Sequence, residues 1–414
     1  MIKAVIMAGG KGTRISSVAS DIPKPMIKIG GKPVLEHEIE CLKAQGFLDI
    51  IITVSHLGSQ IIDYFGDGKK FGVNIEYYYE EKPLGNAGAL YEIKDKLSDT
   101  FLLLNADSLF NVDFQRFLKY HEEKKALATL LTHPNSHPFD SGLIFTDNNQ
   151  SVIKWLSKED ERPRWYKNRV NAGLHILSKE LLTKRPDTEK VDLDRQILKP
   201  LSGTGTMFAY DSPEYVRDMG TPERFYMVSR DYEQGIIENK NLKYKQRAIF
   251  LDRDGTINKY VGFLRKIDDF ELIDGVAEAI KKINDSGYLA IVITNQPVIA
   301  RGEITFEELN EIHMKMETLL GEKGAYLDAI YYCPHHPDSG FPGERRELKF
   351  DCDCRKPKPG LLFKAAKDFN IDLSKSYMIG DGDNDVLCGK NAGCMTKLID
   401  SSNSLQTIIN DIIK

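Results

Sequence analysis

The chain has 414 residues, of which 41% are apolar and 28% are charged, as is typical of a soluble globular protein. This length predicts two or three domains. The formal net charge of −5 gives no reason to expect nucleic acid as a partner, and no apolar run approaches the roughly 20 residues that span a membrane. Because no signal-peptide pattern precedes the first predicted strand, we expect a cytoplasmic protein without a membrane partner.

The first part of the chain alternates short apolar runs with helix-like stretches. Buried parallel strands are predicted for AVIMAG, DIIITVS and FLLLNAD, which are residues 4–9, 49–55 and 101–107. The segment 33–47 has apolar residues at helical spacing, and one helix is predicted to close the domain over 221–240. This order predicts a doubly wound, Rossmann-like α/β domain over residues 1–242.

The alternation starts again after a polar stretch, which predicts a second doubly wound α/β domain over 243–414. Its strands are predicted over 247–252, 288–295 and 375–381, and each ends in a polar residue. Amphipathic helices are predicted over 274–287 and 359–370. Ligands of open α/β sheets bind at the carboxyl ends of strands, so these polar ends predict the active site.

A glycine-rich loop, AGGKGTR, directly follows the first predicted strand, and PKP follows shortly after it. Glycines let the backbone bend tightly and approach phosphate oxygens, which its N–H groups can then bind. The predicted phosphate-binding residues of this loop are Gly9, Gly10, Gly12 and Thr13. Arg14 and Lys24 can neutralise the charge of a departing pyrophosphate.

These motifs resemble the sugar-phosphate nucleotidyltransferase family over roughly residues 1–240. The resemblance implies that the segment LGNAGAL reads the nucleobase and approaches the sugar through Leu84, Gly85, Asn86, Ala87 and Gly88. It also implies a sugar contact by Asn171 and Mg²⁺ bound by Asp107 and Asp218. No protein nucleophile is required, because catalysis consists of positioning and charge neutralisation.

One element departs from the family pattern. The lysine-bearing EKP-like element that the family places before the sugar turn is replaced by SKEDERP, in which Lys158 is the candidate sugar-binding residue. A solvated charged loop is the alternative interpretation of this segment. The segment SSVASDIPKPM, residues 16–26, is most similar to the heptose 1-phosphate guanylyltransferase branch of the family.

The second domain carries DRDGT at the end of its first predicted strand. Asp252 can attack phosphorus, and Asp254 can protonate the leaving oxygen and later activate water. Carboxylates for a Mg²⁺ ion are available from Asp252, Asp254, Asp381 and Asp385. The predicted contacts with the phosphoryl group are Thr294, Asn295, Arg301, Arg355 and Lys356.

These elements resemble the haloacid dehalogenase-like phosphatases over roughly residues 246–400, a family that hydrolyses phosphomonoesters. Four soft ligands are predicted to hold a structural Zn²⁺: Cys333, His335, Cys352 and Cys354. His336 is an alternative ligand. The long gap between His335 and Cys352 favours the heptose 1,7-bisphosphate 7-phosphatases over the similar histidinol-phosphate phosphatases.

The two resemblances imply consecutive steps of one pathway. Hydrolysis of heptose 1,7-bisphosphate at position 7 yields heptose 1-phosphate, which a guanylyltransferase converts with GTP into GDP-heptose and pyrophosphate. One alternative is a nucleotidyltransferase for mannose 1-phosphate or another hexose 1-phosphate, fused to a different sugar or histidinol phosphatase. Another is a sensor or scaffold with an inactive half. Self-association into a homo-oligomer is compatible with the sequence.

Overall fold

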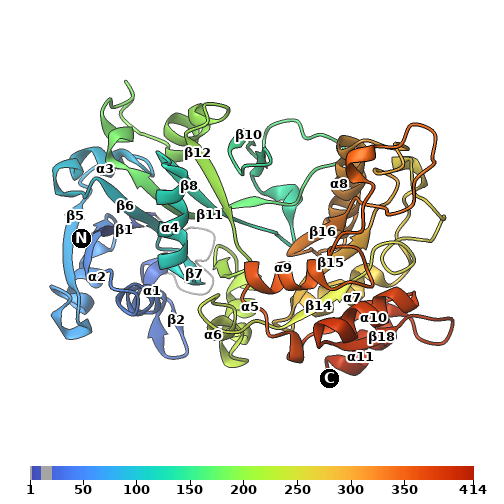
Figure 1. Cartoon of the computed structure of the whole chain (residues 1–414). Helices are drawn as coiled ribbons and strands as arrows, with labels where there is room; N and C mark the ends of the chain where they lie inside the picture. The colour runs from blue at the N-terminus through green and yellow to red at the C-terminus, as the bar shows by residue number, and fades with distance from the viewer. Residues whose placement is uncertain (1, 11–20) are drawn as a thin grey trace. The chain divides into compact units, whose positions relative to one another are not determined.

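The computed structural model describes residues 2–10 and 21–414. Its chain forms two compact units, which Figure 1 shows with their labelled elements. The first unit contains Met1–Thr132, Ile144–Trp155 and Asn171–Asn241, and the second contains His133–Leu143, Leu156–Val170 and Leu242–Lys414. We predicted one boundary, between residues 242 and 243. The segments His133–Leu143 and Leu156–Val170 precede that boundary and yet belong to the second unit. None of the described helices is long and apolar enough to cross a membrane.

A mixed sheet forms the centre of the first unit. Its main path runs in the order β10 (Val152–Leu156), β9 (Leu143–Thr146), β11 (Val170–Ser178), β6 (Thr100–Asn105), β1 (Lys3–Ala8), β4 (Asp49–Val54) and β5 (Asn74–Tyr79). Two more strands extend the sheet from β11: β8 (Ala128–His133) pairs with β11, and β12 (Met207–Asp211) pairs with β8. Neighbours β6, β1, β4 and β5 are parallel, whereas β11 is antiparallel to β6.

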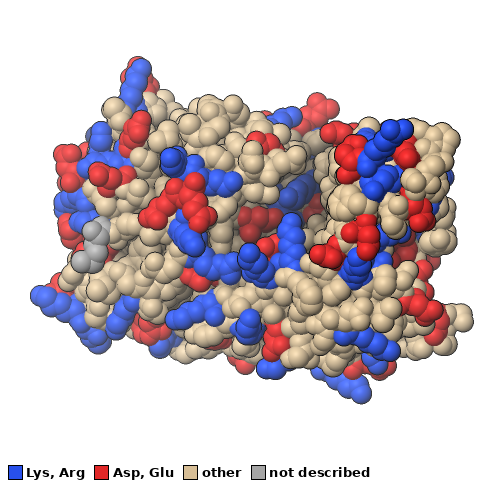
Figure 2. All heavy atoms as spheres, viewed as in Figure 1, with Lys and Arg blue, Asp and Glu red and all other residues tan. Residues whose placement is uncertain are grey.

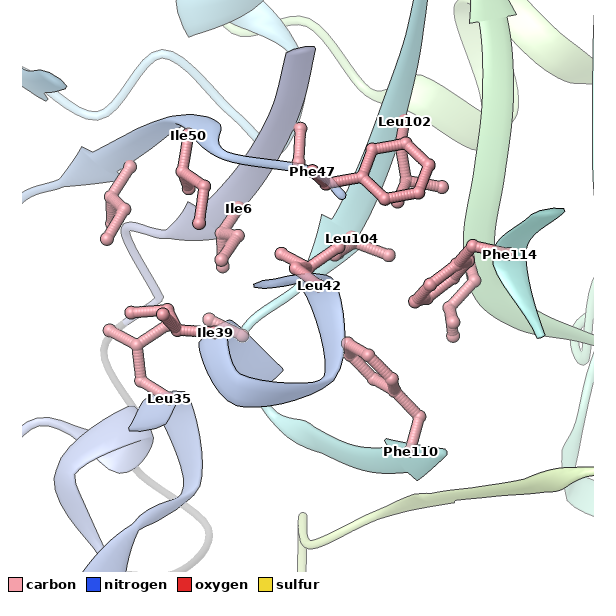
Figure 3. Close-up of a cluster of buried hydrophobic side chains, with 14 of the residues drawn as sticks. Ile6, Leu35, Ile39, Leu42, Phe47, Ile50, Leu102, Leu104, Phe110 and Phe114 are labelled. Atoms are coloured by element: carbon pink, nitrogen blue, oxygen red, sulfur yellow. The ribbon is translucent and has the colours of Figure 1, made fainter. Parts of the chain in front are cut away.

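Helices cover both faces of this sheet. On one face, Ile6, Ile50 and Leu104 pack against α1 (Val34–Lys43), α2 (Gly58–Phe65) and α4 (Phe114–Lys124), as Figure 3 shows in part. On the other face, Val5, Ile51 and Leu103 pack against α3 (Gly88–Glu92) and the π-helix Leu193–Leu198. Successive strand residues alternate between the two cores, because side chains of a strand point to opposite faces. Each large apolar side chain buried in this way contributes about 1.5–3 kcal/mol.

Short elements at the carboxyl end of the sheet complete the first unit. Strand β7 (Ser108–Asn111) pairs antiparallel with β13 (Tyr215–Asp218), and β2 (Lys28–Ile29) pairs with β3 (Lys32–Pro33). The single closing helix that we predicted over 221–240 is wrong, since the chain forms α5 (Pro222–Glu233) and α6 (Ile236–Asn239). Gly235 interrupts the helix with a φ of 67°, in the left-handed region that glycine adopts without strain.

A parallel sheet forms the centre of the second unit. Its order is β16 (Ala329–Cys333), β15 (Leu289–Asn295), β14 (Ala248–Leu251), β17 (Tyr377–Gly380) and β18 (Met395–Leu398). One face packs against α7 (Val276–Asn284), α8 (Phe306–Glu322) and α11 (Leu405–Ile412). The other packs against α9 (Gly360–Asp368) and α10 (Asp383–Ala392). The structure confirms the prediction of two doubly wound α/β domains.

The segment Leu156–Val170 is fixed to α8 by a buried ion pair. Arg169 Nη1 lies 3.0 Å from Glu317 Oε1, and the two side chains are 5% and 3% exposed. The same guanidinium donates to the carbonyl oxygen of Asp328, and Tyr166 N–H donates to Thr318 Oγ1. These bonds make the segment part of the second unit, although sequence order assigns it to the first domain.

We expect Arg169→Ala to lower the free energy of unfolding of the second unit by about 3 kcal/mol, because the change leaves the Glu317 carboxylate buried without its ion-pair partner. Urea unfolding followed by the fluorescence of Trp165 measures this loss in a Trp155→Phe background, which removes the other tryptophan. The exposed Arg164 of the same segment is the matched control, and Arg164→Ala should cost less than about 1 kcal/mol. Equal effects of the two changes would contradict the anchoring role.

Candidate active sites

The first unit has a cavity of about 740 Å³ at the carboxyl ends of its parallel strands. Its lining includes several predicted site residues, namely Gly9, Gly10, Lys24, Gly85, Asn86 and Asp107. The remaining candidates of the glycine loop, Gly12, Thr13 and Arg14, lie outside the described residues. The volume falls in the range of small-molecule sites.

Two carboxylates beside this cavity each have a basic partner. Lys24 Nζ lies 2.8 Å from Asp107 Oδ2, and Arg224 Nη1 lies 2.9 Å from both carboxylate oxygens of Asp218. Asp218 pairs with Ser108 across β13 and β7, so it stands next to Asp107. The pKa of Asp218 is lowered, because Arg224 and Lys24 outweigh the opposing effect of burial. The two predicted metal ligands therefore lie close together, which is compatible with a shared divalent cation.

The segment Leu84–Gly88 divides between the cavity and the core. Gly85 and Asn86 line the cavity, whereas Ala87 and Gly88 are buried at the start of α3. The Ala87 side chain packs in the core, and the predicted part of this segment in nucleobase and sugar binding stays a prediction. Leu84, half-buried, donates its N–H to Glu80 Oε2.

Glu80 is a lining residue that the sequence did not single out. Burial raises the pKa of its carboxyl, which also lies against Gly9, where a Cβ would be 2.9 Å from Oε1. Ser55, another lining residue, donates to the carbonyl oxygen of Gly9 over 2.6 Å. These two side chains therefore contact Gly9 and Leu84 beside the cavity. Neither lies in a motif, so only their contacts reveal them.

The predicted sugar contacts lie in different parts of the fold. Asn171 begins the sugar turn on β11, two residues before Gly173. A Cβ at Gly173 would lie 2.6 Å from the amide nitrogen of Asn105, which lines the cavity. Lys158 is exposed in the segment that belongs to the second unit, and it is not among the described residues that line the cavity. Its contact with sugar stays a prediction.

The second unit has its own cavity, of about 360 Å³, at the carboxyl end of the parallel sheet. The predicted catalytic residues meet there. Lys356 Nζ lies 2.7 Å from Asp252 Oδ1 and 2.6 Å from Asp385 Oδ1, and its side chain is 3% exposed. One oxygen from each of Asp252, Asp381 and Asp385 falls within 4.8 Å of the others. Three close carboxylates with a single buried lysine leave net negative charge, so this site fits a divalent cation.

The charges of this site shift the titration of its carboxyls. Burial raises the pKa of Asp252 to about 6, Lys356 opposes that shift, and Asp385 adds to it. Burial also raises the pKa of Asp381, and Asp385 again adds to the shift. The carboxylates of Asp252 and Asp385 keep the pKa of Lys356 above its ordinary value. Perturbed titration of several groups in one cavity is typical of an active site.

Asp254 is held by side chains from three places in the chain. Arg253, which is fully buried, donates to both of its carboxylate oxygens at 2.9 and 2.8 Å. Gln296 and Asn258 also donate to it, at 2.9 and 3.1 Å. Gly255, the next residue, has a φ of 82°. A Cβ at this position would collide with the Asp381 carboxylate. The glycine of DRDGT therefore lets two acidic residues approach each other.

The predicted phosphoryl contacts have distinct surroundings. Thr294 is buried in the cavity wall, and its Oγ1 accepts from Gln296. The Asn295 side chain exchanges two hydrogen bonds with the main chain of Lys356, so it positions that lysine. Arg355 lines the cavity and also donates to the carbonyl oxygen of His335. The Arg301 guanidinium lies against the rings of Phe263 and Phe341, 4.0 and 4.5 Å from their centroids.

Four soft ligands gather at the end of β16, as predicted. The three sulfur atoms of Cys333, Cys352 and Cys354 lie 3.2–3.5 Å apart, and His335 Nδ1 lies 3.2 Å from Cys354 Sγ. Tetrahedral Zn²⁺ with bonds of about 2.3 Å needs a sulfur separation of about 3.8 Å, close to that observed. The alternative ligand, His336, instead accepts the N–H of Asp338. The cluster is compatible with a metal site that orders the chain just before Arg355 and Lys356.

Comparison with known proteins agrees with these two sites. Residues 3–235 match the nucleotidyl transferase family and residues 353–411 match a HAD-hydrolase-like family, so the chain is an enzyme that combines both classes. The face in Figure 2 mixes Lys and Arg with Asp and Glu.

Particular relatives match each part. The D-glycero-beta-D-manno-heptose-1,7-bisphosphate 7-phosphatase of Haemophilus ducreyi is 44% identical over 155 residues, which are 37% of this chain and 82% of the relative. The mannose-1-phosphate guanylyltransferase of Mycobacterium tuberculosis is 32% identical over 245 residues, 58% of this chain and 67% of the relative. A candidate glucose-1-phosphate thymidylyltransferase structure from Bacillus anthracis shares the fold, with a TM-score of 0.50 and 20% identity over 56% of this chain and 94% of that one. The chain belongs to the nucleotidyl transferase family and, through its second unit, to the family of these phosphatases.

Proposed function

We propose that the chain is a bifunctional enzyme that makes GDP-heptose in two steps. The second unit removes the 7-phosphate of D-glycero-D-manno-heptose 1,7-bisphosphate, and the first transfers GMP from GTP to the resulting heptose 1-phosphate. The observation that carries this proposal is the presence of both sites in one chain, with a phosphatase unit 44% identical to a heptose bisphosphate 7-phosphatase. The product of that phosphatase reaction is a sugar 1-phosphate, the class of substrate that a nucleotidyl transferase uses. A cytoplasmic location stays a prediction.

In the proposed phosphatase reaction, Asp252 attacks phosphorus while the bond between phosphorus and the sugar oxygen breaks. Asp254 gives a proton to the departing oxygen and then takes one from the water that hydrolyses the aspartyl-phosphate. Lys356 and Thr294 hold phosphoryl oxygens in the cavity. Mg²⁺, which Asp252, Asp381 and Asp385 would hold, reduces the repulsion between the carboxylates and the phosphate.

In the proposed transferase reaction, a phosphate oxygen of heptose 1-phosphate attacks the α-phosphorus of GTP, and pyrophosphate leaves. Backbone N–H groups at Gly9 and Gly10 bind the triphosphate, and Lys24 offsets charge that develops at the reacting phosphates. Mg²⁺, which Asp107 and Asp218 would hold, neutralises the two phosphates that must approach each other. The chain positions the two substrates and offsets the negative charge of their phosphates, and no covalent intermediate forms on the protein.

A second candidate for the first unit is mannose 1-phosphate guanylyl transfer. The observation that favours it is the 32% identity to a mannose-1-phosphate guanylyltransferase over 245 residues. The cavity lining does not by itself distinguish a hexose from a heptose, because the two sugars differ only by one hydroxymethylene group. Under this alternative the second unit would act on a phosphate ester that is not a precursor of the transferase substrate.

The test is a coupled assay with mass-spectrometric detection. The purified chain receives heptose 1,7-bisphosphate, Mg²⁺ and equal amounts of the four ribonucleoside triphosphates. GDP-heptose as the main product is the expected result. Accumulation of heptose 1-phosphate without a nucleotide sugar would refute the transferase proposal, and the same mixture with mannose 1-phosphate would then test the second candidate. No phosphate release would refute the phosphatase proposal.

We also propose that the cluster of Cys333, His335, Cys352 and Cys354 holds a structural Zn²⁺. We expect Cys352→Ser to lower the zinc content from one ion per chain and to reduce phosphatase activity by about 10-fold to 100-fold, because Lys356 loses its ordered loop. Metal analysis and phosphate release measure the two effects. The buried Cys394, outside the cluster, is the control, and Cys394→Ser should keep its zinc. Unchanged zinc content in the Cys352 variant would contradict the assignment.

A further inference from the structure

The side chain of Asn171 accepts two hydrogen bonds through one atom. The N–H of Gly173 lies 3.1 Å from Asn171 Oδ1, and His175 Nε2 lies 3.1 Å from the same oxygen. The first bond closes a local turn of the Asx type. The second comes from a ring that is 1% exposed on the same strand, β11. No motif that we identified in the sequence includes His175.

These contacts determine which group donates. The backbone N–H of Gly173 is a donor, so the atom that it meets must be the carbonyl oxygen of Asn171 rather than its amide nitrogen. His175 Nε2 must then carry a proton and donate to that oxygen. Burial lowers the pKa of His175 to about 3, so the ring is neutral and Nδ1 carries a lone pair. This Nδ1 is buried without a protein hydrogen-bond partner in the described part of the chain.

In this arrangement only the Nδ2 amide group of Asn171 remains available for a hydrogen bond to a ligand. Both acceptor positions of its oxygen are filled, while its Nδ2 has no protein partner among residues 2–10 and 21–414. Asn171 is half-buried, and the strand brings Gly173 against Asn105 in the cavity wall. An amide fixed in this way can donate N–H groups to a phosphate or hydroxyl oxygen and cannot present its own oxygen.

We infer that His175 is a positioning residue of the transferase, which orients the Asn171 amide as a hydrogen-bond donor to the sugar phosphate. This inference rests on the proposed transferase function and on the predicted contact of Asn171 with the sugar substrate. It adds a second group, besides the Gly173 N–H, that holds the amide in the orientation of that contact. Without His175 only the Gly173 N–H would hold the amide, and the two bonds together fix an orientation that favours acceptor-rich ligands, such as phosphates, over donors.

The experiment is a double-mutant cycle with steady-state kinetics. His175→Leu should raise the KM for the sugar 1-phosphate about tenfold while the KM for GTP changes less than about twofold, because one oriented hydrogen bond is lost. His175→Gln, whose amide can still donate, should stay within about threefold of the parent. In an Asn171→Ala background, His175→Leu should have no further effect on this KM.

Equal effects of the Leu and Gln variants, or additive effects with Asn171→Ala, would overturn the inference. So would an equal rise in both KM values, which indicates a general loss of structure. A second readout does not depend on turnover: ¹⁵N spectra of histidine-labelled chain should show the Nε2–H tautomer for the resonance that the His175→Gln variant loses. An Nδ1–H tautomer would overturn the inference. Failure of the proposed function would instead appear as absent sugar-phosphate turnover by the unchanged chain.

Discussion

Asp252→Asn is expected to reduce phosphate release from the bisphosphate by more than about 10³-fold while nucleotidyl transfer stays within about twofold of the parent. The amide cannot attack phosphorus, and it removes one of the three clustered carboxylates. The Asn side chain has nearly the shape of Asp, so the fold should persist. The measurement is a pair of rates on one protein preparation, inorganic phosphate from the bisphosphate and pyrophosphate from GTP with sugar 1-phosphate.

The control for Asp252→Asn is a carboxylate of the same neighbourhood that lies outside the cluster. Asp383 is exposed, and it is not among the described residues that line the second cavity. Asp383→Asn should therefore keep phosphate release within about threefold. Loss of both activities in the Asp252 variant would contradict the assignment of separate sites, and normal phosphate release would show that another residue is the nucleophile.

Asp107→Ala is expected to reduce nucleotidyl transfer by about 10³-fold and to leave phosphate release unchanged. The change removes a predicted metal ligand, and it leaves Lys24 Nζ without the carboxylate that now lies 2.8 Å away. Pyrophosphate release from GTP and sugar 1-phosphate measures the loss. Calorimetric titration with GTP and Mg²⁺ then separates weaker binding from slower chemistry.

Asp63 gives a matched control for the Asp107 change, because it is an exposed aspartate of the same unit, on α2. Asp63→Ala should keep both activities within about twofold. Unchanged nucleotidyl transfer by the Asp107 variant would remove this residue from the metal site. A parallel loss of phosphate release would indicate that the change damages the whole chain rather than one site.

The residues that carry the chemistry were largely predictable from the sequence. DRDGT and GDGDND follow predicted strands, and parallel strands bring their carboxyl ends to one edge, so Asp252, Asp381 and Asp385 had to approach each other. The Cys and His spacing likewise predicted the four-ligand cluster. These predictions succeed because a strand end, a short spacing and an obligatory residue type are local properties.

Residues that support the site were not predictable in this way. Ser55 binds Gly9, Glu80 binds Leu84 and Arg224 pairs with Asp218, yet Ser55, Glu80 and Arg224 lie outside the recognised motifs. Their partners are distant in sequence or depend on how a side chain points from its element. The burial of the Ala87 side chain was likewise not predictable from its motif, because burial depends on how α3 packs against the sheet.

The sequence by itself determined the two fold classes, the nature of both reactions, and which carboxylates, cysteines and histidine gather in the second unit. Period-two and helical apolar patterns specify strands and helices, and glycine or acidic residues at strand ends specify phosphate chemistry. Only the tertiary structure decided that residues 156–170 belong to the second unit and that His175 orients Asn171. The physical reason is that both depend on buried polar pairs, whose partners are selected by packing and by the high cost of leaving a buried charge or donor unsatisfied.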